Sequence, residues 1–378
     1  MKMSVYIIPF LFMFSMNAFS EDKDMPLIKD TENACWDKEV EIQGNVYMDS
    51  LCVAKGTVYI KKSNTSLDCR GALIDLEKNF DNAVVVNSGG SPLSSVSIKN
   101  CIFKNSRFKS VYIGWDIPDR QKETNNSSDE IYKLTPSKIN LFNISIQNPG
   151  SSGIYIDDYV QNVVMDGVYI DKAPAMAIYF EHNSRNNILK NSSISESGWK
   201  FKREAVSIDS SSGNLIENNI FSNNFYGSVY LYRNCGERFF SDTTQVIRKM
   251  SSSNNIIRGN KFINSKVPVW IASRQSMGQK NIGCGIGYYA ENKYSLDDAK
   301  NNTVQGNEFD GAEIAVIVED DNNKVVENKF SNVTKIGVRV GTPIRKEYLN
   351  EPVVGTIIRG NENYSKSPLV RYMWGSQE

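Results

Sequence analysis

A nine-residue pattern recurs along the chain and constrains its fold more than any other feature. It consists of Asn or Gly, Asn, any residue, an aliphatic residue, two further residues, Asn, any residue and Phe. Full copies begin at Gly213, Asn254, Asn301 and Asn322, and weaker copies begin at Ser137, Asn162, Asn186 and Gly355. Short apolar runs of β type repeat with this pattern and show no helical period, which predicts a β-solenoid.

Asparagine accounts for 41 of the 378 residues, and the repeat explains the excess. Successive coils of a parallel solenoid lie about 4.8 Å apart, so asparagines at one corner can bond each other's amides along the axis. Asn and Gly also tolerate the left-handed backbone that tight corners require. The Phe or Ile two positions after the last Asn should point inward. We therefore predict that most asparagines build the scaffold.

With these motifs the sequence resembles the right-handed parallel β-helix proteins of the pectin-lyase-like class, from about Val58 to the end of the chain. The resemblance implies an all-β, single-domain parallel β-helix over residues 58–378. Residues 21–57 would form an N-terminal cap, held by Cys35 and Cys52, which hides the first open strand edge.

The first twenty residues are typical of a secretory signal peptide (1–20). Lys2 precedes an apolar run from Val5 to Met16, and Ala18 and Ser20 supply small residues before a cleavage site. No later stretch approaches the roughly 20 apolar residues of a membrane span. The mature chain is therefore expected to be secreted or periplasmic, without a membrane span after signal cleavage.

All six cysteines follow the signal segment, and an even count in an exported chain favours disulfides. Cys235 and Cys284 lie in loops of neighbouring coils, which makes a bond between them the preferred pairing. A zinc site is not expected, because the chain has one histidine and no Cys-x-x-Cys pair.

The 43 basic and 43 acidic residues cancel, which argues against a nucleic-acid partner. With 40% hydrophobic residues the chain can bury a large core, so global disorder is excluded. We expect a monomer.

A second strand follows each repeat, and long insertions follow that strand at about residues 112–136, 233–252, 272–300 and 341–354. Insertions confined to one corner map to one side of a solenoid, usually the binding side. Loops 104–136, 233–252 and 272–300 are expected to set specificity.

Polar and aromatic side chains gather on the outward face of the second strands, because alternate residues of a strand point to opposite sides. One outward column contains Tyr155, Tyr179, Tyr230 and Trp270, and beside it run Asp157, Glu181, Asp209 and Tyr232. One position further lie Asp158, the sole histidine His182, and Arg233, with Arg185, Arg203 and Arg274 nearby. This column predicts an exposed cleft whose aromatic rings stack on sugars and whose charged groups bind their carboxylates and hydroxyls.

Three acids in adjacent coils repel one another unless they share a proton, bind a cation or are offset by arginines. Arg185, Arg203 and Arg233 are the candidates for that offset. Calcium is the candidate cation, although no calcium-loop spacing is present, and no cofactor is certain.

The favoured reaction on this face is β-elimination on an acidic, uronate-containing polysaccharide, including a biofilm or capsule exopolysaccharide. It needs a group that neutralises the substrate carboxylate, a base and an acid. Arg185, Arg233 or a cation held by Asp157 and Asp209 would neutralise, His182 or an arginine would be the base, and Tyr179 or Tyr230 the acid. We assign catalysis to His182, Glu181, Asp157, Asp209, Arg233 and Tyr230, and substrate binding to Tyr155, Asp158, Tyr179, Arg185, Arg203, Tyr232, Trp270 and Arg274.

Glycoside hydrolysis by two carboxylates is the alternative, because strand spacing permits both catalytic separations. The chain has Asp157-Asp158 and His182 one coil later, but it lacks the Gly-His-Gly and Arg-x-Lys motifs of polygalacturonase-like hydrolases. It also lacks the Asp-Pro-His-Asp of the mannuronan C5-epimerases. A third alternative is a non-catalytic, polysaccharide-binding or adhesive β-helix.

Overall fold

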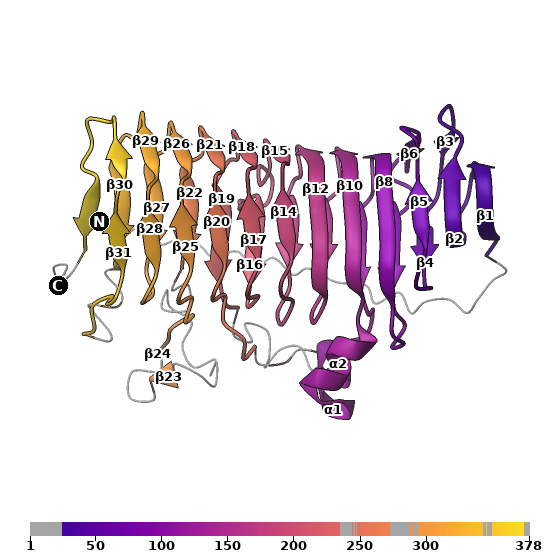
Figure 1. Ribbon diagram of the computed structural model, residues 1–378, viewed down its shortest axis with the longest axis horizontal. Coiled ribbons are helices and arrows are strands. Elements are labelled where there is room, and N and C mark those ends of the chain that lie inside the picture. The colour runs from indigo at the N-terminus through magenta and orange to yellow at the C-terminus, as the bar shows by residue number, and fades with distance from the viewer. Residues whose placement is uncertain are drawn as a thin grey trace, which may run out of the picture.

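The chain folds into one long parallel coil of short strands. The computed structural model describes residues 25–234, 244, 246, 248–272, 288–289, 294–342, 345 and 350–373. Over these residues the strands stack in parallel along a single axis (Figure 1), and only two short helices interrupt them. The predicted all-β parallel β-helix is confirmed.

Each regular coil contributes three strands, which stack into three faces. The first face comprises β14 (Ile188–Lys190), β17 (Leu215–Glu217), β20 (Ile256–Arg258), β25 (Thr303–Gln305), β28 (Lys324–Val326) and β31 (Ile357–Arg359). The second comprises β15 (Ser193–Ser195), β18 (Ile220–Ser222), β21 (Lys261–Ile263), β26 (Glu308–Asp310), β29 (Lys329–Ser331) and β32 (Glu362–Asn363). In the earlier coils one long, bent strand spans both faces: β8 (Ser94–Lys104), β10 (Ser137–Gln147) and β12 (Gln161–Asp171).

The third face, called the site face below, is built from the second strands of the repeat. It comprises β4 (Val58–Ile60), β7 (Val84–Asn87), β9 (Val111–Gly114), β11 (Ile154–Ile156), β13 (Ile178–Phe180), β16 (Val206–Asp209), β19 (Gly227–Tyr232), β22 (Val267–Ile271), β27 (Ile314–Val318), β30 (Ile336–Val340) and β33 (Val370–Tyr372). The pairing places Tyr155 beside Tyr179, Ser207 beside Tyr230, and Tyr230 beside Trp270. This is the predicted register.

Parallel pairing already begins within the residues predicted as a cap. The N-terminal strands are β1 (Leu27–Ala34), β2 (Val40–Met48), β3 (Val53–Ala54), β5 (Ser66–Asp68) and β6 (Leu73–Asp75), and β1 pairs with β2. The expected Cys35–Cys52 disulfide is present, and a second joins Cys69 to Cys101. The boundary of the cap at residue 57 stays a prediction. Residues 1–20, Cys235 and Cys284 lie outside the described part of the chain, so the signal peptide and the Cys235–Cys284 bond also stay predictions.

Asparagines form two continuous ladders along the axis, as the repeat predicts. In the second ladder, the backbone N–H and the side-chain amide of Asn219 donate to Oδ1 of Asn260, at 2.9 and 3.0 Å. Asn260 donates in the same way to Asn307, and Asn307 to Asn328. The first Asn of the repeat has a different role, because Asn254, Asn301 and Asn322 adopt a positive φ at the corner. Both kinds of Asn position in the repeat therefore have a structural role.

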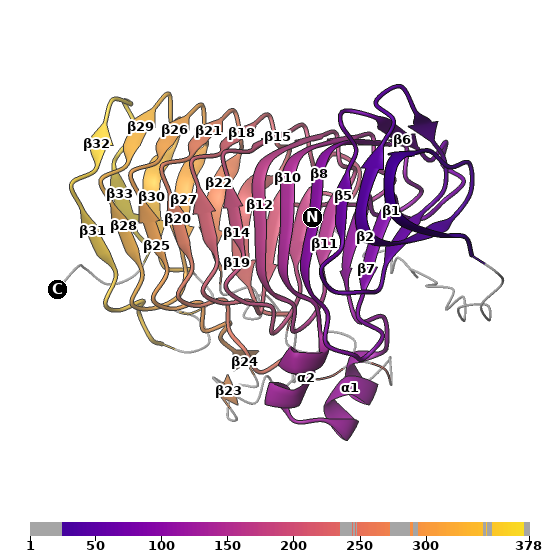
Figure 2. The same ribbon diagram turned by 45° about the vertical axis from the view of Figure 1, so that its right-hand side comes forward.

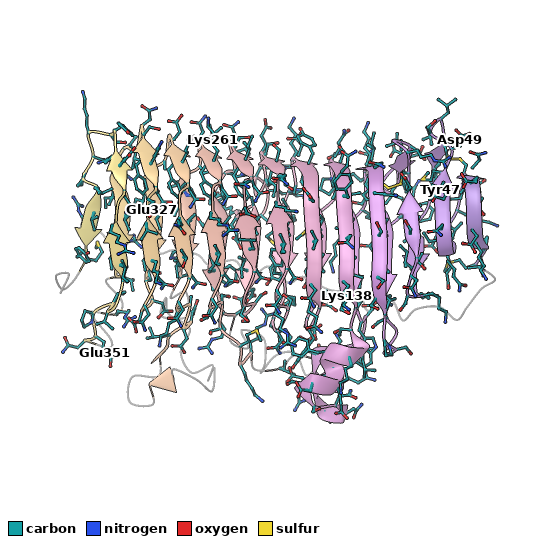
Figure 3. All side chains as sticks on the ribbon, in the orientation of Figure 1. Tyr47, Asp49, Lys138, Lys261, Glu327 and Glu351 are labelled. Carbon is teal, nitrogen blue, oxygen red and sulfur yellow. A yellow bond between two sulfur atoms is a disulfide. The ribbon has the colours of Figure 1, made fainter. Side chains whose placement is uncertain are left out.

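Phenylalanines of the repeat stack inside the coil. Phe221, Phe262, Phe309 and Phe330 are fully buried, and their ring centroids are 4.9 to 5.1 Å apart. Charged residues on the strands and at the corners point outward, as Lys138 in β10, Lys261 in β21 and Glu327 between β28 and β29 show (Figure 3). Alternation along each short strand thus separates a continuous apolar core from a polar surface.

Insertions gather on one side of the solenoid. Helices α1 (Asp119–Asn125) and α2 (Ser128–Leu134) and the small hairpin of β23 (Tyr288–Tyr289) and β24 (Tyr294–Ser295) all lie beneath the coils in Figures 1 and 2. They belong to the predicted insertions after the site-face strands. Neither helix is long enough to cross a membrane, and no other described helix is.

Candidate functional site

Three tyrosines stack on the site face, and each hydroxyl donates to an acid in the next coil. Tyr112, Tyr155 and Tyr179 lie in adjacent strands, with ring centroids 6.1 and 5.2 Å apart. Their acceptors are the carboxylates of Asp157, Glu181 and Asp209, at 2.8, 2.5 and 2.5 Å. The regular register of β9, β11, β13 and β16 repeats this diagonal pair three times.

The acids follow the ends of these strands and are covered by the insertions. Asp158, His182 and Asp209 are at most 1% exposed, Glu181 is 7% exposed, and Tyr179 is 6% exposed. The predicted open aromatic cleft is therefore wrong for the described structure. Sequence alternation places these side chains outside the apolar core, but it carries no signal that α1 and residues 248–250 pack over them.

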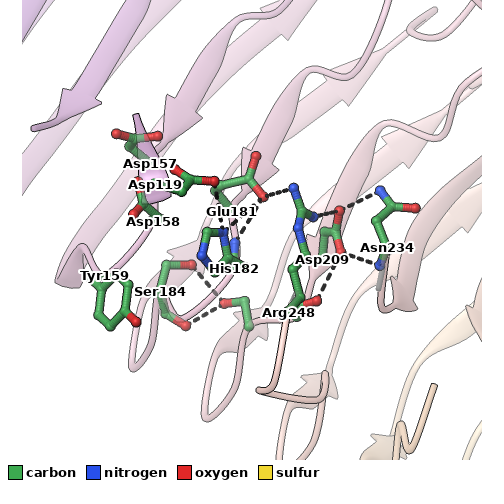
Figure 4. A network of polar contacts seen from close by, with 12 residues as sticks. Asp119, Asp157, Asp158, Tyr159, Glu181, His182, Ser184, Asp209, Asn234 and Arg248 are labelled. Carbon is green, nitrogen blue, oxygen red and sulfur yellow. Dashed lines mark hydrogen bonds and ion pairs between the residues drawn. The ribbon is translucent and has the colours of Figure 1, made fainter. Parts of the chain in front are cut away.

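Two cations from the insertions neutralise part of this charge. The Lys122 ammonium, on α1, contacts Asp158 and lies 3.2 Å from Oδ2 of Asp157. The Arg248 guanidinium bonds Asp209 and lies 2.7 Å from Oε1 of Glu181 (Figure 4). Burial alone would raise the pKa of Glu181, but Arg248 and the neighbouring His182 hold it below its ordinary value.

The arginines predicted to offset the acids pair elsewhere. Arg185 lies over the Tyr132 ring, at 3.6 Å, and donates to Gln161. Arg203 forms a two-point ion pair with Glu204 and also contacts the Tyr232 hydroxyl. The guanidinium of Arg233 is fully buried against Leu296 and Asp298. The side chain of Arg233 turns toward a later coil and pairs with Asp298, so it does not supply the predicted offset to the three acids.

The remaining predicted residues form a separate group further along the same face. Tyr230 packs edge-on against Trp270, with ring centroids 5.2 Å apart, and its hydroxyl donates to the backbone of Tyr226. The indole N–H of Trp270 donates to Glu319, at 2.8 Å, and Tyr232 donates to Glu204. Arg274 lies outside the described residues. The structure thus gathers Tyr155, Asp157, Asp158, Tyr179, Glu181, His182 and Asp209. Tyr232 pairs with Asp209 in the next strand but directs its hydroxyl to Glu204, and Tyr230 and Trp270 lie one and two coils beyond Asp209.

His182 occupies an unusual position between three acidic side chains. Its Nδ1 atom lies 3.9 Å from Asp119 and 3.7 Å from Glu181, and its Nε2 atom lies 3.6 Å from Glu123. Neither ring nitrogen has a hydrogen-bond partner within the described residues, although the side chain is only 1% exposed. Burial alone would disfavour the imidazolium, but Asp119, Glu123 and Glu181 raise the pKa of His182 to about 10.

Asp119, Asp158 and His182 form a candidate metal centre. One ligand atom of each lies within 4.8 Å of the others. Oδ2 of Asp158 is fully buried and has no hydrogen-bond partner among the described residues, because Lys122 contacts the other oxygen. Two carboxylate oxygens and an imidazole nitrogen suit copper(II) and zinc, whereas calcium prefers oxygen ligands alone.

Sequence reasoning missed the residues that the insertions contribute, namely Asp119, Lys122, Glu123 and Arg248. One signal for these residues was available in the sequence: the first insertion directly follows the strand that occupies the position of β11 in the preceding coil. Within it, Asp119, Lys122 and Glu123 have the spacing of one helix face.

The fold and this site define a class: parallel β-helix proteins with a buried acidic site under one-sided insertions. A family model described as "Periplasmic copper-binding protein (NosD)" matches residues 142–365, which is well over half of the chain. The chain therefore belongs to the NosD family. No curated protein sequence matches it.

Several solved structures share features of the fold at low identity. The catalytic domain of GH87 alpha-1,3-glucanase in complex with nigerose is 10% identical, over 93% of this chain and 68% of that chain, with a TM-score of 0.48. Alginate lyase from Paenibacillus sp. str. FPU-7 is 10% identical, over 84% and 91%, with a TM-score of 0.46. A tailspike protein of E. coli bacteriophage HK620 in complex with pentasaccharide is 12% identical, over 93% and 57%, with a TM-score of 0.49. These likenesses are distant, and they assign no substrate to this chain.

Proposed function

We propose that this chain is a periplasmic protein that binds a divalent metal ion, copper(II) first, through Asp119, Asp158 and His182. The observation that carries the proposal is His182, a buried imidazole whose two nitrogens lie 3.6 to 3.9 Å from carboxylates and form no hydrogen bond among the described residues. Buried polar atoms normally have partners, and an orphaned pair of them indicates a missing ligand. The family description names copper and the periplasm, and two disulfides fit an oxidising compartment.

The charge balance of the site supports a cation. Six carboxylates surround His182 or lie next to its neighbours, and Lys122 and Arg248 are the cations in direct contact with them. The six are Asp119, Glu123, Asp157, Asp158, Glu181 and Asp209. Protonated His182 is a third cation among them, and a divalent ion that binds the imidazole displaces its proton, so the ion would add one net positive charge.

The three ligand atoms also favour copper(II) over copper(I). Copper(I) prefers sulfur ligands, whereas copper(II) accepts imidazole and carboxylate. The described cysteines are all in disulfides. Neighbouring residues would keep the three ligands in place. Lys122 bonds one oxygen of Asp158, and α1 carries Asp119 and shields His182 from water.

Metal titration of the mature protein tests the proposal. After treatment with a chelator, the protein should take up one copper(II) per chain, measured by calorimetry and elemental analysis. His182→Ala should weaken binding by about 100-fold or more, since losing even an outer-shell partner of a metal ligand costs 10–100-fold. Glu319→Gln, which changes a buried acid elsewhere on the site face, should bind like the unaltered chain.

Zinc and calcium titrations show which ion the site prefers. Equal copper(II) affinity in the His182→Ala variant would contradict the proposal, as would failure to bind any of the three ions. Circular dichroism of each variant separates loss of the site from loss of the fold.

A second candidate function, polysaccharide cleavage by β-elimination, is favoured by the three tyrosine–carboxylate pairs in consecutive coils. A tyrosine that shares its proton with a carboxylate can protonate a leaving oxygen. His182 lies beside Glu181, but its pKa is raised to about 10, so the imidazolium would first have to lose its proton to serve as the base. Glycoside hydrolysis by a pair of these carboxylates, and epimerisation, would use the same face. Substrate access would require α1 and Arg248 to move away from the acids.

Incubation with a panel of acidic polysaccharides tests this second function. Elimination predicts new ultraviolet absorbance from unsaturated products together with new reducing ends, and Tyr179→Phe should lower the rate by about 100-fold or more. Reducing ends without absorbance would instead indicate a hydrolase. Absence of both signals across the panel would leave metal binding as the function of the site.

A further inference from the structure

We propose that one corner of the solenoid, away from the buried acids, binds a linear acidic polysaccharide along the axis. The corner lies just before the site-face strands. Its exposed aromatic residues are Phe108, Trp199 and Phe225, and its exposed lysines are Lys172, Lys200, Lys202 and Lys266. These seven residues are called the corner strip.

The three rings are large exposed apolar groups at one position of the coil. Phe108, Trp199 and Phe225 are 51%, 48% and 55% exposed. They precede β9, β16 and β19, which are linked through β11 and β13 into one ladder. At the strand spacing of a sheet, Trp199 and Phe225 are one coil apart and Phe108 is about 14 Å from Trp199 along the axis. Exposed apolar patches rimmed by polar residues mark sites where a partner binds, and Trp199 and Phe225 in adjacent coils form the centre of this one.

The loop that carries Trp199 is fixed to the coil beneath it. Gly198 donates to the carbonyl of Ala173 at 2.9 Å, and the N–H groups of Lys200 and Phe201 donate to the carbonyl of Pro174. The indole N–H of Trp199 lies 3.3 Å from the carbonyl of Lys172. Gly198 has a φ of +82°, and a Cβ there would lie 1.8 Å from the carbonyl oxygen of Arg203, so the turn requires glycine. Such preorganisation lowers the entropy lost on binding.

The charge of the corner strip selects the partner. Lys200, Lys202 and Lys266 form no ion pair with any described acidic residue, whereas Lys172 lies 3.7 Å from Glu196 and 3.8 Å from Asp171. Unpaired ammonium groups beside flat apolar rings complement a polymer of sugar rings that carry carboxylates. The exposed rings lie along the axis, as the sugars of a linear polymer would. The disulfides indicate an oxidising compartment, which favours a polysaccharide over a nucleic acid.

Retardation in gels that contain alginate or polygalacturonate tests this inference, with dextran as the neutral comparison. The unaltered protein should be retarded by the acidic polymers and released by added salt. Trp199→Ala with Phe225→Ala should weaken binding by about tenfold, and Lys200→Glu with Lys202→Glu by at least as much. The matched control is Phe142→Ala, which removes a 51%-exposed ring from β10 and should change binding by less than about twofold.

Several results would overturn the inference. They are equal weakening by Phe142→Ala, no retardation by either acidic polymer, and tighter binding to single-stranded DNA or to phosphatidylglycerol vesicles. The corner-strip variants keep Asp119, Asp158 and His182, so their copper(II) titration should match that of the unaltered chain. Loss of polymer binding and loss of copper(II) binding are therefore measured separately, so either proposal can fail without the other.

Discussion

At the scale of single residues, buried charges on the site face are neutralised by specific ion pairs. Glu204 shows the rule most simply, because its environment is separate from the candidate metal centre. It is 4% exposed, and Arg203 contacts both of its oxygens, at 3.0 and 3.2 Å. The Tyr232 hydroxyl donates a further bond at 2.8 Å. Burial would raise the pKa of Glu204, but the charge and hydrogen bonds of Arg203, and the hydrogen bond from the Ser207 hydroxyl, lower it to about 2.

This pKa predicts a loss of stability in acid. A carboxyl with a lowered folded-state pKa contributes stability above its ordinary value of 4.5, and the contribution is lost as the pH falls through about 2. The pair should therefore contribute about 3 kcal/mol that disappears between pH 4.5 and 2. Urea unfolding at several pH values checks this: Glu204→Gln should be less stable at pH 6 and should lose less stability on acidification. An identical pH dependence in both proteins would contradict it.

Residue roles could be predicted from the sequence only where the repeat supplies them. Asp157, Glu181, His182 and Asp209 follow aligned strands, so their proximity follows from the register. Lys122, Asp119 and Arg248 come from insertions that have no repeat. Their approach depends on long-range packing, for which the pattern carries no information. The same reason explains why Arg233 pairs with Asp298 and not with the three acids that it was predicted to offset.

At the scale of the element, one coil is held to the next by side-chain amides inside the corner. Asn260 accepts from the backbone and side chain of Asn219, and it donates to Asn307 and to the carbonyl of Ile216. Each amide thus replaces a backbone bond that the corner interrupts. The strands themselves have about three residues, so these bonds form much of the link between coils.

Asn260→Ala should therefore destabilise the solenoid by about 3 kcal/mol or more, because it leaves several fully buried polar groups without partners. The matched control is Asn264→Gly, at an exposed corner with a positive φ that glycine also adopts. That change should cost less than about 1 kcal/mol. Thermal or urea unfolding measures both, and similar losses for the two variants would contradict a special role for the ladder.

Element prediction succeeded because the same few residues recur in every coil. The Asn and Phe positions specify corners and core at once, and the strand alternation between them specifies the outward face. The helices α1 and α2 were not predicted, although α2 begins with a capping box at Ser127 and Glu130. A seven-residue helix inside an insertion gives too short a periodic signal.

At the scale of the whole molecule, the solenoid separates a buried site from an exposed surface. On the site face, Asp158, Glu181 and Asp209 are buried under Lys122 of α1 and Arg248, whereas the residues of the corner strip are exposed to solvent. Both are fixed to the same rigid stack of coils, and the insertions lie on one side of it (Figure 1). A metal centre held under one side and a polymer bound along a corner would keep the ion at a constant distance from that polymer.

The most direct measurement is the anomalous diffraction of crystals soaked in copper(II), collected on both sides of the copper absorption edge. The metal assignment predicts one strong anomalous peak between Asp119, Asp158 and His182, which disappears in His182→Ala crystals. Electron paramagnetic resonance of the same complex should show coupling to a single nitrogen, since the chain has one histidine. A peak at another position, or none at this one at full copper occupancy, would contradict it.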